Sequence, residues 1–186
     1  MIDVAIILGS TRPGRRAEVV ARWIFEIARK RSDARFEVVD LADFNLPHLD
    51  EPMPPSLGKY TQPHTKAWAA KIAGFDAFVF VTPEYNHGPS GALKNAIDFL
   101  YREWNNKAAA FVGYGGSGAS RAIEQLRLIM AEVQVATVRA QVGLSLLTDF
   151  ENYTIFKPAP RQEAAVAPML DQLVAWGSAL KPLRQT

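Results

Sequence analysis

The sequence predicts an α/β fold, with a five-stranded parallel sheet and helices packed on both of its faces. Short, almost wholly apolar runs alternate along the chain with longer segments whose apolar residues recur every three or four positions. The first pattern is typical of strands buried on both faces, and the second of helices that bury one side. A chain of 186 residues, 48% of them hydrophobic, is long enough for one sizeable core and short for two. We therefore expect a single domain over residues 1–186.

The elements follow one another in a regular alternation of strand and helix. Ile2 to Leu8 is a nearly unbroken apolar run, and Val20, Trp23, Ile24 and Ile27 then recur at helical spacing. The remaining strands are expected at 36–41, 77–81, 108–112 and 135–142, and the remaining helices at 67–73, 91–101, 120–133 and 164–180. Five strands alternating with five helices favour a right-handed, doubly wound sheet in the order 2-1-3-4-5, which is the flavodoxin-like order.

Two connections are longer than the ~2 to 6 residues that are usual in such folds. Residues 43–63 carry five prolines, and residues 143–160 carry Phe150, Tyr153 and Phe156. Each connection could cover a ligand or a partner subunit, and each could equally be a packed surface loop.

Composition excludes several classes of chemistry. The chain has no cysteine, so disulfides, thiolate nucleophiles and cysteine metal sites are excluded and any redox chemistry must come from a cofactor. His48, His64 and His87 share no metal-ligand spacing, so we interpret them as surface or loop histidines and expect no metal. No apolar run approaches the ~18 residues of a membrane span, and Asp3 stands where a secretory leader needs basic residues. We expect a cytoplasmic protein without a membrane partner.

The charge pattern gives no support for nucleic-acid binding. The formal net charge is only +2, and the chain has neither a basic stripe interleaved with aromatic residues nor zinc-finger spacing. Eight arginines and lysines do fall between Arg12 and Arg35, but Glu18 with Arg22 and Glu26 with Lys30 stand four residues apart. This spacing predicts ion pairs on a solvated helix face.

The loop after the first strand has the composition of a phosphate site. In a sheet of order 2-1-3-4-5, ligands bind at the carboxyl ends of the strands, near the order reversal between strands 1 and 3. The first loop there, Gly9 to Arg16, offers hydroxyls, guanidiniums and the free amides of a helix N-terminus. It lacks the lysine and the hydroxyl that a nucleotide triphosphatase requires, because Arg15 and Arg16 follow Gly14. A single terminal phosphate fits this loop better.

The loop after the third strand, Thr82 to Pro89, places an acid, a phenol and an amide on a proline-stiffened turn. These groups could offer hydrogen bonds to a planar heterocycle. In the simpler interpretation, Pro89 or Ser90 starts the following helix, and both interpretations can hold together.

The loop after the fourth strand, Gly113 to Gly118, matches G-x-G-x-x-G but follows the wrong strand for a Rossmann NAD site, and no acid stands where that site needs one. A hydrolase nucleophile elbow at Ser117 is also excluded, because its triad histidine must follow the serine and all three histidines precede it. The glycines are better suited to letting the backbone approach a flat ligand.

Taken together, the three loops resemble those of the NADPH-dependent FMN reductase family, the flavodoxin-like quinone, chromate and azo-dye reductases. The resemblance runs through G-S-T-R, P-E-Y-N and L-K-N-A-I-D to the closing W-G-S-A-L-K-P-L-R, and so covers nearly the whole chain. It implies one flavodoxin-like FMN-binding domain. It further implies that the phosphate is held by Ser10, Thr11 and Arg12, that one ring edge meets Pro83, Glu84, Tyr85 and Asn86, and that the other side meets Gly115, Gly116 and Ser117.

One departure from the family concerns the phosphate loop. Many members carry a serine and an asparagine where this chain has Arg15 and Ala17. Arg15 or Arg16 could replace them as a charged donor to the FMN phosphate, or one of them could face the 2′-phosphate of NADPH.

The resemblance also implies an activity and an assembly. NADPH or NADH would reduce the flavin, and a small acceptor such as a quinone, chromate, an azo compound or free flavin would then be reduced, with no obligatory catalytic side chain. A homodimer or homotetramer is implied, and Phe99, Leu100, Tyr101 and Trp104 could form its interface or pack under residues 43–63. The alternatives are a flavodoxin-type electron carrier and a phosphate-binding regulatory module.

Overall fold

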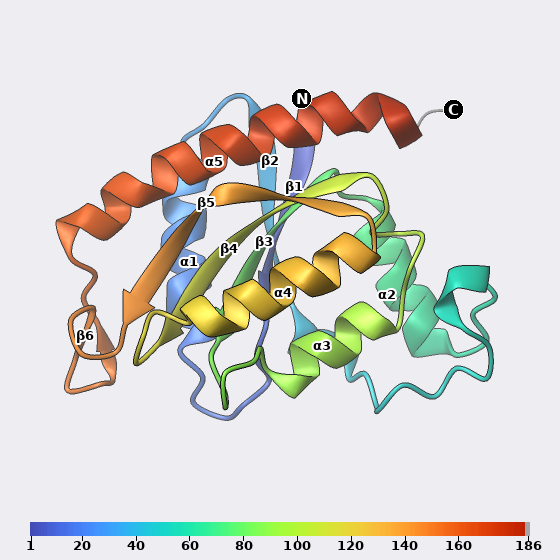
Figure 1. Cartoon of the computed structure of the whole chain (residues 1–186), viewed down its shortest axis with the longest axis horizontal. Coiled ribbons are helices and arrows are strands. Elements are labelled where there is room, and N and C mark those ends of the chain that lie inside the picture. Colours follow the sequence, from blue (N-terminus) through green and yellow to red (C-terminus); the bar gives the residue numbers. More distant parts are fainter. Residues whose placement is uncertain (185–186) are drawn as a thin grey trace.

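The computed structural model describes residues 1–184 and confirms the doubly wound architecture (Figure 1). Five strands form one parallel sheet in the order β2-β1-β3-β4-β5: β1 (Ile2–Leu8), β2 (Ala34–Asp40), β3 (Ala77–Pro83), β4 (Lys107–Gly115) and β5 (Val135–Ser145). The principal helices are α1 (Ala17–Ala28), α2 (Pro63–Ala73), α3 (Gly91–Asp98), α4 (Ser120–Glu132) and α5 (Pro160–Leu180), and short 3-10 turns lie at η1 (Leu41–Phe44), η2 (Pro55–Leu57) and η3 (Lys181–Arg184). The predicted sheet order is therefore correct.

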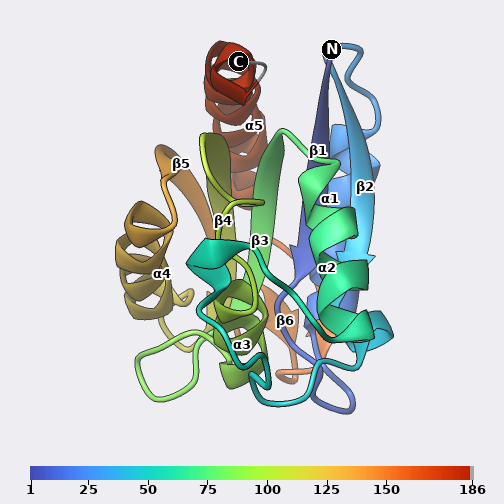
Figure 2. The same ribbon diagram turned by 90° about the vertical axis from the view of Figure 1, so that its right-hand side faces the viewer.

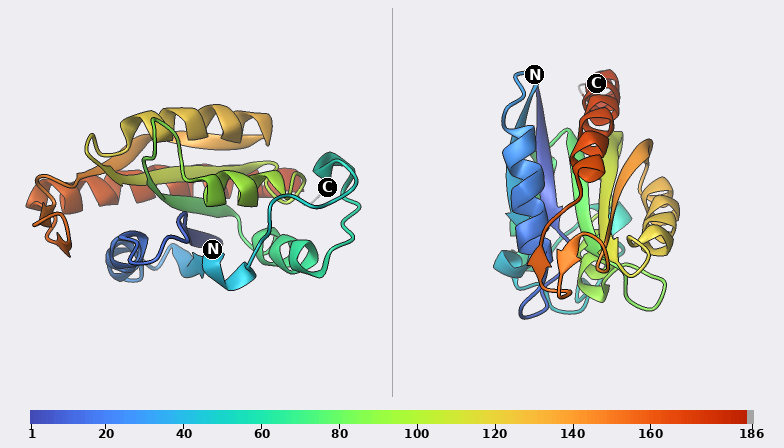
Figure 3. Two further views of the ribbon diagram at one scale, coloured as in Figure 1. Left: turned by 90° about the horizontal axis from the view of Figure 1, so that it is seen from below. Right: turned by 90° about the vertical axis from the view of Figure 1, so that its left-hand side faces the viewer.

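The helices divide between the two faces of the sheet. Figure 2 shows α2 and α3 in front of the strands, with α4 beside β5, whereas the right-hand view of Figure 3 shows α1 and α5 in front of them. The core divides in the same way, because successive strand residues point to opposite faces. In β1, Val4 and Ile6 join the core under α1 and α5, while Ala5 and Ile7 join the core under α2, α3 and α4.

Several elements extend beyond their predicted limits, and proline explains two of the differences. Both α2 and α5 begin at a proline, Pro63 and Pro160, because the first helical position tolerates a residue without an amide hydrogen. Helix α3 instead ends at Asp98, three residues earlier than predicted. Strands β4 and β5 continue to Gly115 and Ser145, so they reach further into the edge where the loops converge.

The first long connection, residues 43–63, packs as a surface loop beside α2 and α3. The amide of Asn95 in α3 donates to the Pro47 carbonyl at 2.6 Å, and its oxygen accepts the Leu49 amide hydrogen at 3.1 Å. The Glu51 carboxylate accepts both the amide and the hydroxyl of Thr61 at 2.8 Å. The loop is thus held by side chains at two separate points.

The second long connection contains an unpredicted antiparallel hairpin, β6 (Phe150–Glu151) and β7 (Ile155–Phe156). Two of its three turn residues, Asn152 and Tyr153, have positive φ angles, of 49° and 57°. Figure 3 shows this hairpin beside the end of α1, where Phe156 packs edge-on against Trp23 at 5.5 Å between ring centroids.

Of the two alternatives for the apolar residues after α3, the structure favours packing within the chain. Phe99, Leu100 and Trp104 are buried in the core under α2, α3 and α4, and Tyr101 is partly buried against the same core. The pairs predicted along α1, in contrast, differ from those in the structure. Glu18 pairs with Arg15 rather than Arg22, and Glu26 pairs with Arg29 rather than Lys30.

Lys107, the first residue of β4, is a buried amine at the end of the sheet opposite to the three loops. Its Nζ donates to the Ile72 carbonyl at 2.8 Å and lies 5.4 Å from the centre of the Phe78 ring. The amine therefore satisfies a carbonyl at the end of α2. Burial, reinforced by the nearby positive charge of Arg184, lowers the pKa of Lys107 to about 7.

We predict that Lys107 makes the folding stability rise with pH above neutrality. The unfolded lysine, with a pKa of ~10.4, binds a proton that the folded one has lost, so stability rises as pH increases from 7 towards 10. Relative to a Lys107→Met variant, the wild type should gain up to about 1.4 kcal/mol per pH unit in that range. Urea unfolding of both proteins at several pH values measures this, and a pH-independent difference between them would contradict the assignment.

Candidate functional site

The loops after β1, β3 and β4 meet at one edge of the sheet, as predicted. The Gly9 amide donates to the Val81 carbonyl at 2.8 Å, and the Glu84 amide donates to the Tyr114 carbonyl at 3.3 Å. Between the loops lies a cavity of about 210 Å³. Its lining comes from all three loops and from the last connection, and comprises residues 12–16, Pro83, Glu84, Tyr85, Tyr114, Gly115, Leu146 and Tyr153.

The first loop is fixed at its base by a close backbone contact. A Cβ atom on Gly9 would lie 2.7 Å from the Val81 carbonyl oxygen and 2.9 Å from Leu93, so only glycine fits there. The Ser90 hydroxyl donates to the Gly9 carbonyl and accepts the Leu93 amide at 3.1 Å, which makes Ser90 the N-cap of α3. The predicted start of this helix is therefore correct, and the same serine anchors the loop.

The three arginines of the first loop have different surroundings. Arg15 forms an ion pair with Asp40, at 2.9 Å for one of its two contacts, and donates to the Ser10 carbonyl at 2.7 Å. Arg16 donates to two carbonyl oxygens, those of Gly14 at 3.0 Å and Tyr153 at 3.2 Å. Within residues 1–184, the Arg12 side chain has no hydrogen-bond or ion-pair partner. Arg12 is thus exposed and uncommitted, whereas the charge of Arg15 is compensated.

Tyr114 is a site residue that the sequence reasoning missed. Its side chain is 5% exposed and lines the cavity, and within residues 1–184 its hydroxyl has no partner of good hydrogen-bond geometry. Burial, with a smaller contribution from Tyr85, raises the pKa of the Tyr114 phenol, while the nearby Ser10 hydroxyl and Ala17 amide oppose that rise. A neutral donor without a partner therefore lies next to Ser10 and the first residue of α1.

Glu84 joins the second loop to the third. Its carboxylate accepts from the Arg121 guanidinium at 2.6 Å and from the Arg121 and Ala122 amides at 3.1 and 3.3 Å, at the start of α4. Burial opposes its ionisation, but these hydrogen bonds and the charge of Arg121 outweigh burial and lower the pKa of Glu84. The carboxylate thus holds the start of α4, and the Glu84 Cβ lies 3.4 Å from where a Cβ on Gly115 would be.

The rest of the second loop forms a tight turn. Tyr85 and Gly88 exchange two backbone hydrogen bonds, of 2.9 and 3.0 Å, across Asn86 and His87, which both have positive φ angles. This turn leaves Tyr85 38% exposed beside the cavity.

The three histidines lie in loops or near the surface, as predicted. His48 and His87 are exposed, and the His64 ring forms a hydrogen bond with Asp50.

The glycines of the third loop serve two purposes. A Cβ on Gly113 would lie 2.7 Å from both the Ala119 side chain and the Gly118 carbonyl, so this glycine permits tight packing. Gly116, in contrast, has no atom within 4 Å of its Cβ position, and Gly116 and Ser117 are both exposed. The second part of the loop therefore presents open backbone.

The residues present fit an FMN group. The phosphate end offers amides at the α1 N-terminus, the uncommitted Arg12 and the unpartnered Tyr114 hydroxyl, and the ring end offers Tyr85 and the open Gly116 backbone. Among residues 1–184, no cluster of histidine and acidic side chains could hold a metal ion. No helix in that part of the chain is long and apolar enough to cross a bilayer.

Comparison with known proteins identifies the family. Residues 2–149 match the family described as NADPH-dependent FMN reductase. The chain is 42% identical over 148 residues to the NAD(P)H-dependent FMN reductase C4B3.06c of Schizosaccharomyces pombe, covering 78% of this chain and 74% of that protein. It is 35% identical over 134 residues to a quinone reductase of Pseudomonas putida, covering 66% of this chain and 68% of the relative.

A solved structure shows the same fold. The flavoenzyme FerB, an NAD(P)H:acceptor oxidoreductase of Paracoccus denitrificans, superposes with a TM-score of 0.75 at 21% identity, covering 96% of this chain and 98% of FerB. The match over residues 2–149 and the identity to curated relatives carry the assignment further than fold alone. This chain belongs to the NADPH-dependent FMN reductase family.

Proposed function

We propose that this protein is an FMN-dependent oxidoreductase that takes electrons from NADPH or NADH and passes them to a small acceptor. The observation that carries the proposal is one cavity lined by the loop after β1 and by the loops after β3 and β4. Relatives are named as FMN reductases, quinone reductases and, in Staphylococcus aureus, an FMN-dependent NADPH-azoreductase. A quinone, an azo compound, chromate or free flavin would each suit a site with an open face.

The FMN phosphate would be held by Ser10, Thr11, Arg12 and the amides at the start of α1. These groups surround a helix N-terminus, where the helix dipole and unpaired amides favour an anion. Arg15 would act indirectly, because its ion pair with Asp40 and its bond to the Ser10 carbonyl hold the loop in shape. Tyr114, near the end of β4, would add a hydroxyl donor.

The flavin ring would lie between Pro83, Tyr85 and Asn86 on one side and Gly115, Gly116 and Ser117 on the other. When bound, FMN supplies the redox chemistry, and the chain supplies binding and orientation. Glu84 would position both walls through its bonds to the α4 N-terminus. We assign no side chain as a catalytic acid or base.

A flavodoxin-type electron carrier is the alternative. Such carriers are usually strongly acidic, whereas this chain has a formal net charge of +2. We also propose that the protein is cytoplasmic and forms a homodimer or homotetramer through a surface other than Phe99, Leu100 and Trp104.

The purified protein should bind FMN and oxidise NADPH or NADH when a quinone or azo dye is present. A carrier acting alone should show almost no steady-state oxidation. Spectrophotometric assays with both nucleotides and a panel of acceptors, with and without added FMN, measure this. Absence of flavin binding at micromolar concentrations would contradict the proposed function.

Arg12→Ala should weaken FMN binding by roughly 10- to 150-fold, because a charge-assisted hydrogen bond contributes about 1.5 to 3 kcal/mol. Riboflavin, which lacks the phosphate, should bind this variant and the wild type almost equally. Fluorescence titration measures both affinities, and Arg22→Ala, at an exposed position of α1, is the matched control. Equal losses for FMN and riboflavin would show that Arg12 supports the ring or the loop instead.

Tyr114→Phe should weaken FMN binding about 2- to 10-fold without lowering the stability of the flavin-free protein. The hydroxyl has no well-formed partner in the free protein, so its removal leaves no broken hydrogen bond behind. Urea unfolding without flavin and FMN titration measure the two effects separately. A destabilised flavin-free protein with unchanged FMN affinity would mean that the hydroxyl serves the fold and not the ligand.

A further inference from the structure

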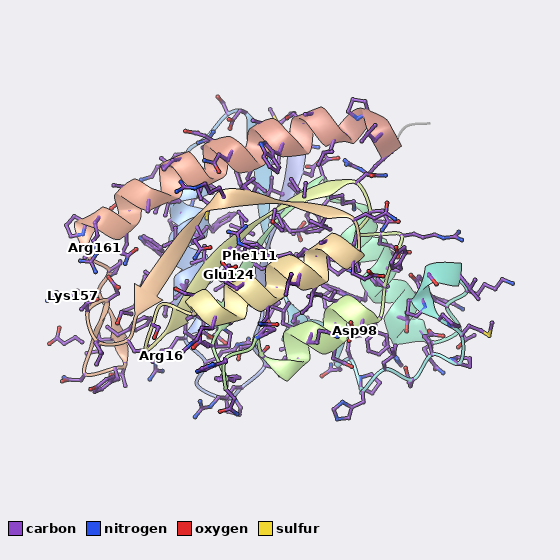
Figure 4. All side chains as sticks on the ribbon, viewed as in Figure 1. Arg16, Asp98, Phe111, Glu124, Lys157 and Arg161 are labelled. Atoms are coloured by element: carbon purple, nitrogen blue, oxygen red, sulfur yellow. The ribbon has the colours of Figure 1, made fainter. Side chains whose placement is uncertain are left out.

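We propose that Lys107 is a nucleophilic amine that small acyl phosphates acylate, in a basic cavity at the end of the sheet opposite to the proposed flavin site. The inference does not depend on the proposed function, because the residues that carry it line a second cavity. Figure 4 shows the separation of the two regions. Arg16, in the first loop, and Asp98, at the end of α3 that leads towards β4, lie on opposite sides of the molecule.

The second cavity has a volume of about 330 Å³ and lies where α2 ends, β4 begins and η3 follows α5. Its lining comprises Ala73, Asp76, Arg102, Glu103, Lys107, Lys181 and Arg184. Four of these side chains are basic and two are acidic. Even with a neutral Lys107, three positive charges stand against two negative ones. A lining of this charge favours a small anion.

Arg102 is the cation of this cavity that no acid neutralises. Asp76 pairs with Lys181, at 2.8 Å, and with Arg184. Arg102 instead donates its Nε hydrogen to the Ser56 carbonyl at 3.2 Å, and within residues 1–184 it forms no ion pair. Its terminal nitrogens therefore keep donors for a phosphate group.

Lys107 presents a buried amine whose contacts are with carbonyl oxygens. Its Nζ donates to the Ile72 carbonyl at 2.8 Å and more weakly to the Ala73 carbonyl at 3.4 Å. The residue is only 3% exposed, so a positive charge on the amine would have lost most of its water. A neutral amine has two hydrogens for these two carbonyls, and its lone pair is then free to attack an electrophile.

The surrounding charges keep part of this amine unprotonated at neutral pH. Burial lowers the pKa of Lys107 to about 7, and the positive charge of Arg184 adds to this effect. The carboxylates of Asp76 and Glu103 oppose the change without outweighing it. A lysine in water, with a pKa of ~10.4, is unprotonated in only about one molecule in 2,500 at pH 7. Desolvation beside another cation is a general way of activating a lysine as a nucleophile.

The acyl transfer needs no further reactant. The Nζ lone pair forms a bond to the acyl carbon, and the bond from that carbon to the phosphate oxygen breaks, with its electron pair remaining on the oxygen. The proton released from Nζ leaves with the phosphate, so no side chain has to act as a base. Arg102 holds the phosphate of the donor and stabilises the charge that develops on it.

The contacts of Nζ favour acylation over condensation with an aldehyde. The amide product keeps one hydrogen on Nζ, which is enough for the Ile72 carbonyl at 2.8 Å. A neutral imine, formed from an aldehyde with loss of water, would keep none and would leave that carbonyl without its donor.

The test is site-resolved mass spectrometry of the wild type treated with acetyl phosphate under native conditions. Lys66, exposed on α2, is the internal reference. At pH 7, Lys107 should be acetylated at least about 10-fold faster than Lys66, because much more of its amine is unprotonated. The rate at Lys107 should level off above about pH 8, whereas a lysine in water gains about tenfold per pH unit up to pH 10.

Arg102→Gln separates binding of the phosphate from reactivity of the amine, with Arg22→Gln as the matched control on α1. The variant should slow acetylation of Lys107 by acetyl phosphate about 2- to 5-fold, which is the range of a partly exposed charge pair. Acetylation by the uncharged N-hydroxysuccinimide ester of acetic acid should be almost unchanged. Arg22→Gln should alter neither rate.

Two outcomes would overturn the proposal. Acetylation of Lys107 no faster than that of Lys66 at pH 7 would show that the amine is protonated or out of reach. Equal effects of Arg102→Gln on the two reagents, including no effect on either, would show that this cavity does not hold the phosphate of the donor. Both measurements can be made without flavin, so they stand apart from the test of the proposed function.

Discussion

The space at Gly9 is the constraint on which the rest of the site depends. There is room for a hydrogen atom but for no side chain, because the Val81 carbonyl would lie 2.7 Å from a Cβ atom. This contact places the end of β1 directly against β3, and the Ser90 hydroxyl then fixes the Gly9 carbonyl from α3. The loops after β1 and β3 and the start of α3 therefore share one rigid base. A bulkier residue at Gly9 would push the first loop away from the loops after β3 and β4 before any ligand contact was made.

Ion pairing gives the three arginines of the first loop different roles. Three guanidiniums within five residues would repel one another and would give a poorly defined loop if all were free. Asp40, at the end of β2, neutralises one of the three charges. Arg15 donates to its carboxylate and to the Ser10 carbonyl. Two charges then remain for ligands, one uncommitted at Arg12 and one bonded only to carbonyl oxygens at Arg16.

The fold could be predicted from the sequence because it depends on local patterns, whereas much of the site depends on distant partners. Apolar runs and helical spacing gave five strands, five helices and their order. Nothing near Arg15 in the sequence indicates Asp40, which lies 25 residues away in the chain. The β6–β7 hairpin was missed because its turn, Asn152-Tyr153-Thr154, lacks the glycine that usually marks such turns. Tyr114 was not predicted as a site residue, because the loop around it was interpreted through its glycines. Its inward-facing position in β4 could have indicated it.

The apolar residues after α3 show a second limit of prediction from the sequence. Helix α3 ends at Asp98, and the chain continues with Phe99, Leu100 and Trp104. Apolar residues beyond the end of a helix are compatible with a subunit interface. The chain instead turns back, and Trp104 packs edge-on against Phe78, with 5.0 Å between ring centroids. Apolar character alone predicts burial, but it does not say whether the covering surface belongs to the same chain.

The walls of the cavity are held by hydrogen bonds within the protein, which suits a site that must receive different ligands in turn. Glu84 ties the loop after β3 to the start of α4, and Asp149, fully buried, accepts hydrogen bonds from the Ser145 and Ala159 amides at 2.9 and 3.1 Å. Both carboxylates are occupied by the protein itself, so the shape of the walls does not rely on a ligand. Among the other residues that line the cavity, Arg12, Arg16 and Tyr114 keep unused hydrogen-bonding capacity. A preformed frame lined with unfilled hydrogen-bonding capacity lowers the ordering cost of binding, and it does so for each ligand that enters.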